Sequence, residues 1–232
     1  MAPDPLGTAL IDYYRGRTSE KLLLRTSYTD IEEMPVDVFF REPEDFPALE
    51  YIALALCDGR VLDVGAGAGS HALYLQRQGI EVVALEHSPQ ACTVMRERGV
   101  RQVVLEDFFN YSAATYDTLL FMMNGIGVAG TVDRLKKLLQ HSRSLLKEGG
   151  QLLFDSSDVA YLYADGFIEK PEGYYGEIQY QYEYKGVRGE PFNWLFIDQA
   201  TLIQHGQREG WVVQILYEDQ NDQYLARMTP VM

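Results

Sequence analysis

Cysteine and histidine are scarce in this chain of 232 residues. The only cysteines, Cys57 and Cys92, are too few for a disulfide-based scaffold, and two free thiols in a reducing compartment are the simpler interpretation. The 4 histidines are scattered along the chain, and no group of cysteine, histidine and aspartate has the spacing of metal ligands. The sequence therefore predicts no metal site.

Basic residues are also few, with 20 Lys and Arg against 34 Asp and Glu, so the formal net charge is -14. A surface with this excess repels a phosphate backbone, and no run of Lys or Arg offers a local exception, so we expect no nucleic acid partner. No apolar run approaches the roughly 20 residues that span a bilayer, and residues 1–5 lack the basic and apolar parts of a signal peptide. These absences predict a cytoplasmic protein without a membrane partner, and they leave a homo-oligomer open.

From residue 60 onward, short apolar runs alternate with helical patterns. The apolar runs predict strands at residues 61–64, 81–86, 102–105, 118–123 and 152–154. One of the helices between them is expected to begin at Ser88 and to end near Gly99, and another runs from Val132 to a stop at Gly149. This alternation indicates an α/β fold with a parallel sheet covered on both faces, in which ligands bind beyond the carboxyl ends of the strands.

The strongest chemical signal is the loop at residues 63–69, with the sequence DVGAGAG, between the first strand and the next helix. Glycine at 65, 67 and 69 permits a tight turn and lets a ligand approach the bare backbone. A nicotinamide dinucleotide site has the spacing G-x-G-x-x-G, whereas in this chain the third glycine comes one position early and Ser70 stands where that pattern has Gly or Ala. A tight turn without any ligand is the alternative interpretation.

Three further strand ends carry polar or soft side chains. Glu86 ends the second strand, where a carboxylate can accept hydrogen bonds from a ribose diol. Asp107 and Phe108 follow the third strand, where an acid can accept from an adenine amino group and a ring can cover the base. Met123 and Asn124 end the fourth strand, which suits close approach by a bulky ligand. Each strand end also has an interpretation without a ligand. Glu86 could be a solvated acid, Asp107 and Phe108 could begin an ordinary loop, and Met123 and Asn124 could belong to core packing followed by a loop.

Together these features resemble the class I S-adenosylmethionine-dependent methyltransferase family over residues 60–155. The loop 61–69 looks like the family's first motif, Glu86 stands at the position of its ribose-binding acid, and residues 145–153 look like its turn before the fifth strand. The resemblance implies a doubly wound, Rossmann-like, seven-stranded sheet, mostly parallel, with an antiparallel strand from a C-terminal hairpin. It implies S-adenosylmethionine as cofactor and S-adenosylhomocysteine as product. The cofactor-binding residues that we expect are Asp63, Gly65, Ala66, Gly67, Gly69, His71, Glu86, His87, Asp107, Phe108, Met123 and Asn124.

The rest of the chain is interpreted around this core. Residues 1–58 are expected to form an N-terminal helical cap, and residues 59–232 the methyltransferase domain. Residues 156–192 are expected to be a β-rich insertion on the substrate side, after the fifth strand. The candidate substrate residues in these additions are Tyr13, Tyr14, Tyr174 and Tyr175. Alternatively, tyrosines of the insertion pack on the sheet or on a second subunit.

The functional hypothesis is methyl transfer from S-adenosylmethionine to a small-molecule acceptor by in-line displacement. The cofactor's methyl group is already electrophilic, so the protein must chiefly bind, orient and exclude water. No catalytic residue is assigned. Asn124 is not followed by the Pro-Pro-aromatic sequence that nucleic-acid-methylating relatives use, which disfavours methylation of a base. Two alternatives stay open: a nicotinamide-dependent oxidoreductase, and a protein that binds an adenosyl cofactor without catalysis.

Overall fold

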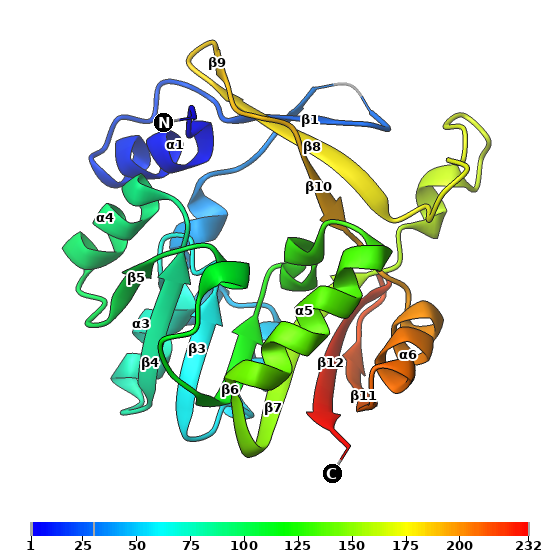
Figure 1. Ribbon diagram of the computed structural model, residues 1–232. Coiled ribbons are helices and arrows are strands. Elements are labelled where there is room, and N and C mark those ends of the chain that lie inside the picture. Colours follow the sequence, from blue (N-terminus) through cyan, green and yellow to red (C-terminus); the bar gives the residue numbers. More distant parts are fainter. Residues whose placement is uncertain (1, 30, 232) are drawn as a thin grey trace. The chain divides into compact units, whose positions relative to one another are not determined.

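The computed structural model describes residues 2–29 and 31–231 (Figure 1). Its α-helices are α1 (Pro5–Tyr14), α2 (Ala48–Ala55), α3 (Ser70–Arg77), α4 (Pro89–Arg98), α5 (Val132–Leu145) and α6 (Gln199–Arg208). Its strands are β1 (Leu23–Thr26), β2 (Glu32–Glu33), β3 (Arg60–Val64), β4 (Glu81–Glu86), β5 (Val103–Leu105), β6 (Tyr116–Phe121), β7 (Leu146–Ser157), β8 (Glu177–Tyr184), β9 (Val187–Arg188), β10 (Phe192–Leu195), β11 (Trp211–Glu218) and β12 (Gln223–Pro230). Its 3-10 segments are η1 (Asp37–Phe40), η2 (Pro43–Asp45), η3 (Phe108–Asn110), η4 (Gly125–Ala129) and η5 (Ala160–Tyr163).

A seven-stranded sheet has the order β11-β12-β7-β6-β3-β4-β5. Parallel pairing joins β6 to β7 and β4 to β5. The hairpin β11–β12 is antiparallel, and β12 also runs antiparallel to β7. The predicted fold class, a mostly parallel Rossmann-like sheet with an antiparallel C-terminal hairpin, is therefore confirmed.

A second, smaller sheet has the order β10-β8-β1-β2, with β9 paired to β8. Strand β8 runs antiparallel to β1, with Leu23 opposite Glu183 and Thr26 opposite Tyr180. The segment expected to be a helical cap thus also supplies two strands. The expected strand character of the insertion is present in β8.

The tyrosines of β8 are partly core residues. Tyr184 is 3% exposed and clusters with Ala9 and Leu22, and Tyr182 packs against this cluster. The Tyr184 hydroxyl donates a hydrogen bond to Asp12 Oδ2 at 3.3 Å. Packing in the core therefore accounts for the burial of Tyr182 and Tyr184. Such packing is the alternative to a substrate role that the sequence left open for the tyrosines of the insertion.

The chain forms two compact units, each assembled from separate segments. The first contains residues up to 46, 63–111 and 179–192, and the second contains 47–62, 112–178 and 193 onward. In the first unit α1 packs on α4, and in the second α6 packs on β11 (Figure 1). These two units do not test the predicted division of the chain into a cap of residues 1–58 and a domain of residues 59–232, so that division stays a prediction.

Local sequence signals account for both ends of α4. The Ser88 hydroxyl accepts a hydrogen bond from the Ala91 N–H at 3.0 Å, and Pro89 takes the first helical position. Gly99 ends the helix in the left-handed region, with φ of +95°. The predicted start and stop of this helix are confirmed.

The prediction for the end of α5 is wrong in detail. The helix ends at Leu145, and β7 begins at the next residue. Gly149, the expected helix stop, lies inside β7 with φ of +76°. The pairing of Leu146 with Tyr116 on β6 draws this segment into the sheet. Sheet pairing therefore overrides a local helical pattern at this junction.

The core of the second unit lies between α5 and the strands β6 and β7 (Figure 1). Apolar residues three or four positions apart on α5 face the sheet. The fully buried side chains of these three elements include Leu135, Leu138, Leu139, Leu119, Leu120, Phe121, Leu152, Leu153 and Phe154. This packing holds the carboxyl ends of β6 and β7 in a defined place.

The structure can be compared with the sequence on three points, namely its cysteines, membrane-spanning helices and metal-ligand groups. Cys57 and Cys92 are both buried, and within the described residues neither is part of a disulfide. Among the described residues, none of the helices is long and apolar enough to cross a membrane. Within residues 2–29 and 31–231, no three Cys, His, Asp or Glu side chains are grouped so as to hold a metal ion.

Candidate functional site

The glycine-rich loop joins β3 to α3 through three left-handed glycines. The φ angles are +69° at Gly65, +55° at Gly67 and +85° at Gly69, values that L side chains rarely adopt. The N–H groups of Gly65 and Ala66 both donate to the Leu85 carbonyl, at 2.9 and 3.2 Å. The conformation of the loop is thus set by β4 as well as by its own glycines.

The space beside Gly65 is open. Apart from the chain neighbours of Gly65, no atom of the described residues lies within 4 Å of a Cβ atom built on it. In contrast, a Cβ on Gly69 would lie 2.9 Å from both Met95 Cγ and Val100 Cγ2. Gly69 therefore lets the start of α3 lie close to Met95 and Val100, whereas Gly65 presents bare backbone to a space that a ligand can enter.

The N-terminal segment contributes to the surroundings of Gly67. A Cβ built on Gly67 would lie 3.4 Å from Phe39 Cδ1. The Ser70 hydroxyl donates to the Phe39 carbonyl at 3.0 Å, so η1 is attached to the start of α3. Sequence analysis missed Phe39, because no local pattern links residues 31 positions apart.

Asp63 lies on β3 immediately before the loop and is 2% exposed. Its Oδ2 atom is buried and has no hydrogen-bond partner among the described residues. Burial raises the pKa of Asp63 to about 6, although the nearby His71 opposes this and Glu86 adds to it. A buried carboxylate oxygen without a partner is costly, so a donor or cation supplied by a ligand fits this position.

Glu86 at the end of β4 organises the backbone around it. Its Oε2 accepts from the Gly67 N–H at 3.0 Å, and its Oε1 accepts from the N–H groups of His87 and Ser88 at 2.8 and 2.9 Å. Burial alone would raise the pKa of Glu86, but the hydrogen bonds from His87, Ser88 and Gly67 lower it on balance. The group is therefore ionised at neutral pH, and Oε2 retains capacity to accept a hydroxyl donor.

The two predicted histidines have different environments. His71 on α3 is 7% exposed, and its ring centre lies 5.3 Å from that of Phe46. The His87 side chain is 79% exposed, and its Nδ1 lies 3.0 Å from Glu86 Oε1. The hydrogen bond to Glu86 raises the pKa of His87. Their cofactor-binding roles stay predictions.

Asp107 and Phe108 begin the turn after β5. Asp107 Oδ1 accepts a hydrogen bond from the Phe109 N–H at 2.8 Å and so caps η3. The Phe108 ring is 4% exposed and packs edge-on against Phe109, with ring centres 5.4 Å apart. Because its ring is buried, Phe108 fits the predicted adenine contact less well than the exposed Asp107. Both assignments stay predictions.

Met123 and Asn124, in the second unit, form a left-handed turn after β6, with φ of +66° and +55°. The Asn124 N–H donates to Asp155 Oδ2 at 2.8 Å. Sequence analysis missed Asp155, although an acid directly after an apolar strand core was a visible signal. The cofactor-binding roles of Met123 and Asn124 stay predictions.

The predicted substrate residues Tyr13 and Tyr14 lie at the end of α1. Their ring centres are 4.8 and 6.4 Å from that of Phe40. The Tyr14 hydroxyl donates to the Glu97 carbonyl of α4 at 3.1 Å. These contacts attach α1 to its neighbours, and a substrate role for the two tyrosines stays a prediction.

The rings of the predicted substrate residues Tyr174 and Tyr175 contact each other at a tilt of 38°, with ring centres 4.8 Å apart. Their hydroxyls donate to Asp198 Oδ2 and Asp158 Oδ1 respectively, each at 2.7 Å. Burial and these carboxylates raise the pKa of both hydroxyls. Asp158 and Asp198, together with Glu218, line a cavity of about 310 Å³. The two tyrosines thus hold Asp198 and Asp158 at the acidic wall of this cavity. A contact of the tyrosines with a substrate stays a prediction.

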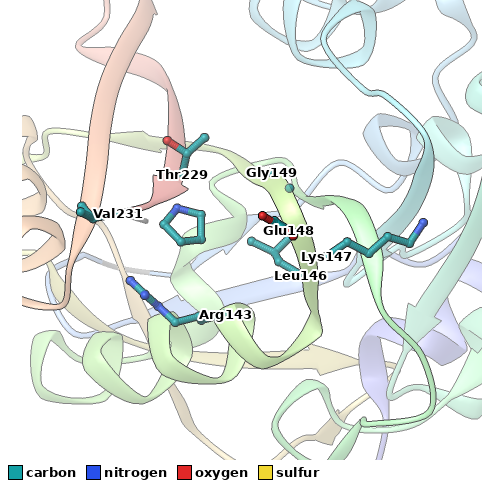
Figure 2. Close-up of a pocket in the computed structure, with 9 residues that line it drawn as sticks. Arg143, Leu146, Lys147, Glu148, Gly149, Thr229 and Val231 are labelled. Carbon is teal, nitrogen blue, oxygen red and sulfur yellow. The ribbon is translucent and has the colours of Figure 1, made fainter.

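Another cavity, of about 230 Å³, lies at the start of β7 (Figure 2). Its cationic side chains already have partners: Arg143 donates to the Gly210 carbonyl, and Lys147 Nζ lies 2.7 Å from Asp117 Oδ2. Residues 146–150 form one wall. The lining contains none of the predicted cofactor or substrate residues, so we do not place the candidate site there.

Comparison with known proteins links these features to one family. A family model described as a methyltransferase domain matches residues 19–211. The crystal structure of an S-adenosylmethionine-dependent methyltransferase from Bacteroides fragilis, in complex with S-adenosylhomocysteine, is 39% identical. It matches over 99% of this chain and 95% of that chain, with a TM-score of 0.92.

Other solved structures are similar in fold alone. An S-adenosylmethionine-dependent methyltransferase from Clostridium acetobutylicum is 13% identical, with 82% of this chain and 94% of that chain covered and a TM-score of 0.60. The CcbJ methyltransferase from Streptomyces caelestis is 16% identical, with 98% of both chains covered and a TM-score of 0.67. The curated proteins contain no match to this sequence.

Proposed function

Because the chain belongs to the S-adenosylmethionine-dependent methyltransferase family, we propose that it methylates a small-molecule acceptor by in-line displacement. S-adenosylmethionine is its cofactor, since the relative that is 39% identical was crystallised with S-adenosylhomocysteine. The choice of acceptor and the geometry of transfer are the proposed parts.

One observation carries the placement of the cofactor in the first unit. Asp63, whose Oδ2 has no partner among the described residues, precedes Gly65 by two positions, and the described residues leave the space beside Gly65 open. A buried acid requires a positive or hydrogen-bonding partner, and bare backbone allows close approach. Both requirements suit the amino group and the methionine end of the cofactor, so the residues present fit it.

The roles of the chain's own residues follow from their chemistry. Asp63 holds the amino group, the backbone at Gly65 and Gly67 lies along the cofactor, and Glu86 accepts hydrogen bonds from its ribose. Asp107 accepts from the adenine amino group. When bound, the cofactor supplies a methyl group that its sulfonium makes electrophilic. The protein contributes orientation and exclusion of water, and we assign no general base.

The acceptor is proposed to be a small molecule that is not a polyanion. The net charge of -14 supports this, as does the acidic wall formed by Asp158, Asp198 and Glu218. Tyr13, Tyr14, Tyr174 and Tyr175 remain the proposed substrate-side residues. The cytoplasmic location and the homo-oligomer also stay predictions.

Thermal unfolding with added ligand tests the cofactor assignment. S-adenosylhomocysteine is expected to stabilise the protein by about 2.7 kcal/mol at a hundredfold excess over its dissociation constant, because it binds only the folded state. NADH at the same concentration serves as the control and is expected to leave the melting temperature unchanged. Stabilisation by NADH alone would instead favour the nicotinamide-dependent alternative.

The pH dependence of binding tests the role of Asp63. The pKa of Asp63 is raised to about 6, so the carboxylate takes up a proton below this pH and loses its attraction for the cofactor's amino group. The affinity for S-adenosylhomocysteine is therefore expected to fall as the pH drops from about 7 to about 5. Asp63→Asn should bind more weakly at pH 7 and show a smaller dependence on pH in calorimetric titrations.

The pH dependence of unfolding without ligand provides a second test of Asp63. A raised pKa means that the folded state binds the proton more tightly than the unfolded state does. The ionised Asp63 therefore destabilises the free protein as the pH rises through about 6. Asp63→Asn should then unfold no more easily than the wild type at pH 7. A variant that is both destabilised and unchanged in affinity would contradict the assignment.

A further inference from the structure

The glycine-rich loop after β3 is held in place by residues outside it. Glycine adopts positive and negative φ almost equally well, so the three glycines at 65, 67 and 69 do not keep one conformation by themselves. The first half of the loop is held from β4, through the Leu85 carbonyl and the Glu86 carboxylate. The second half, residues 68–70, has a different support.

That support is Arg98, the last residue of α4. Its Nη1 atom carries two hydrogens and donates to the Ala68 carbonyl at 2.7 Å and to the Ser70 hydroxyl at 3.2 Å. The Ser70 hydroxyl in turn donates to the Phe39 carbonyl at 3.0 Å. One guanidinium nitrogen therefore joins α4 to the loop and, through Ser70, to η1.

Two further contacts attach the N-terminal segment to Arg98. The guanidinium carbon lies 5.0 Å from the centre of the Phe40 ring, and Nη2 lies 3.7 Å from Glu42 Oε1. Phe39 lies beside the loop as well, since a Cβ built on Gly67 would be 3.4 Å from Phe39 Cδ1. Arg98 thus holds this segment against the loop that we assign to the cofactor.

The Arg98 side chain is nearly buried although it carries a charge. It is 9% exposed, whereas the side chain of Arg77 on α3 is 54% exposed. Burial lowers the pKa of Arg98 and the charge of Glu42 raises it, and an arginine keeps its proton at neutral pH. A buried cation is costly unless it has partners. The contacts of Arg98 with the loop and with η1 are what make its charge tolerable in this place.

We propose that Arg98 is a positioning residue, whose guanidinium group holds the glycine-rich loop, through Ala68 and Ser70, in the conformation that binds S-adenosylmethionine. This inference rests on the proposed function, which places the cofactor at this loop. Arg98 acts through the loop and has no contact of its own with the cofactor in this proposal. The residues concerned all belong to the first unit.

The expected effect on affinity comes from the cost of ordering the loop. A ligand that binds a mobile loop loses part of its binding free energy in ordering it, whereas a loop already fixed by the protein avoids this loss. Hydrogen bonds from a charged donor are stronger than neutral ones. Their removal is therefore expected to free the second half of the loop and to weaken the binding of the cofactor.

The affinity for S-adenosylhomocysteine, measured on the full chain by calorimetric titration, tests this inference. Arg98→Met keeps the apolar part of the side chain but removes its charge and its donors, so we expect the dissociation constant to rise about tenfold. Arg96→Met is the matched control, because the exposed Arg96 lies in the same helical turn and donates to the Val103 carbonyl at 3.4 Å, away from the loop. We expect this control to stay within about twofold of the wild type. Equal dissociation constants for the two variants would overturn the inference.

Ser70→Ala separates the support of the loop from a general loss of stability. Alone, this change is expected to raise the dissociation constant about fourfold, because the Ser70 hydroxyl joins Arg98 to η1. Added to Arg98→Met, it is expected to raise the constant by less than about twofold, because the support is already lost. Equal losses in the two backgrounds would show that the two residues act independently and would overturn the inference.

The guanidinium group of the wild type keeps the inference testable if Arg98→Met does not fold. The Nη1 hydrogens are engaged by Ala68 and Ser70, so their exchange with water can be followed by NMR. Because coupling between two sites is reciprocal, S-adenosylhomocysteine should slow this exchange about threefold or more. An exchange rate that the bound ligand leaves unchanged would overturn the inference.

The two proposals fail in different ways. If the wild type does not bind S-adenosylhomocysteine, the proposed function is wrong, and the positioning role of Arg98 falls with it. If the wild type and Arg98→Met bind equally well, the cofactor site stands and the positioning role is wrong. Hydrogen exchange of the amides at residues 65–70, measured without ligand, reports on the support itself. It is expected to be about threefold or more faster in Arg98→Met than in the wild type, and equal rates would overturn the inference.

Discussion

Replacing Gly65 with alanine is expected to weaken the binding of S-adenosylhomocysteine roughly a hundredfold, the equivalent of about 2.7 kcal/mol. In the part of the chain that the structure describes, a Cβ atom at this position meets nothing within 4 Å beyond its chain neighbours, so the fold has room for it. The space that it enters is the one that we assign to the cofactor. The cost to stability is expected to be only about 1–2 kcal/mol, because an L side chain is strained at the φ of +69° that Gly65 adopts.

Gly79, which follows α3, provides a matched control for this substitution. Its φ is +81°, and a Cβ built on it also has no described residue within 4 Å other than its chain neighbours. Gly79→Ala should therefore lose similar stability in urea denaturation but keep the affinity of the wild type in calorimetric titration. Equal binding by the two variants would exclude Gly65 from the cofactor site.

Replacing Glu86 with alanine is expected to weaken cofactor binding at least tenfold, because hydrogen bonds from the ribose to a charged acceptor are lost, at roughly 1.5–3 kcal/mol each. The structure also predicts that Glu86→Ala lowers the stability of the protein. Glu86 is 6% exposed and accepts from the N–H groups of Gly67, His87 and Ser88, so its removal leaves these donors without a partner. The free energy of unfolding should fall by about 1–3 kcal/mol or more.

The two effects of Glu86→Ala can be separated. Glu81→Ala, at the exposed start of the same strand, is the control and should change neither quantity appreciably. Titration at a temperature where the variant remains folded isolates the loss of affinity. A folded Glu86→Ala protein with the dissociation constant of the wild type would show that this acid only supports the loop.

Several parts of the fold could be predicted from local patterns. The capping of α4 by Ser88 and its stop at Gly99 depend on residues within one or two turns of each other. The three glycines of the loop after β3 all have positive φ, a conformation that glycine adopts at low cost. The parallel sheet could be expected because alternating strands and helices have few other ways to bury their apolar faces.

Other features depended on contacts between distant residues. Glu86 was interpreted as a ligand-facing acid, but its contact with the Gly67 N–H joins positions 19 apart. The pairing of Leu24 with Tyr182 places β8 in a second sheet that no pattern predicted. The junction at Gly149 became strand because pairing with β6 outweighed a local helical period.

The amino-acid sequence by itself determined the class of sheet and the glycine turn after β3, because caps, glycines and hydrophobic periods act over a few residues. The cofactor was indicated by the resemblance of the sequence to a known family. Only the tertiary structure showed which acids hold the backbone, as Glu86 and Asp155 do. It also showed that Asp63 keeps a buried oxygen without a hydrogen-bond partner among the described residues. Asp155 and Asn124 lie 31 positions apart, and nothing in either local sequence encodes their hydrogen bond. Burial in the packed core brings them together, and burial also raises the pKa values of Asp63 and Asp155 to about 6.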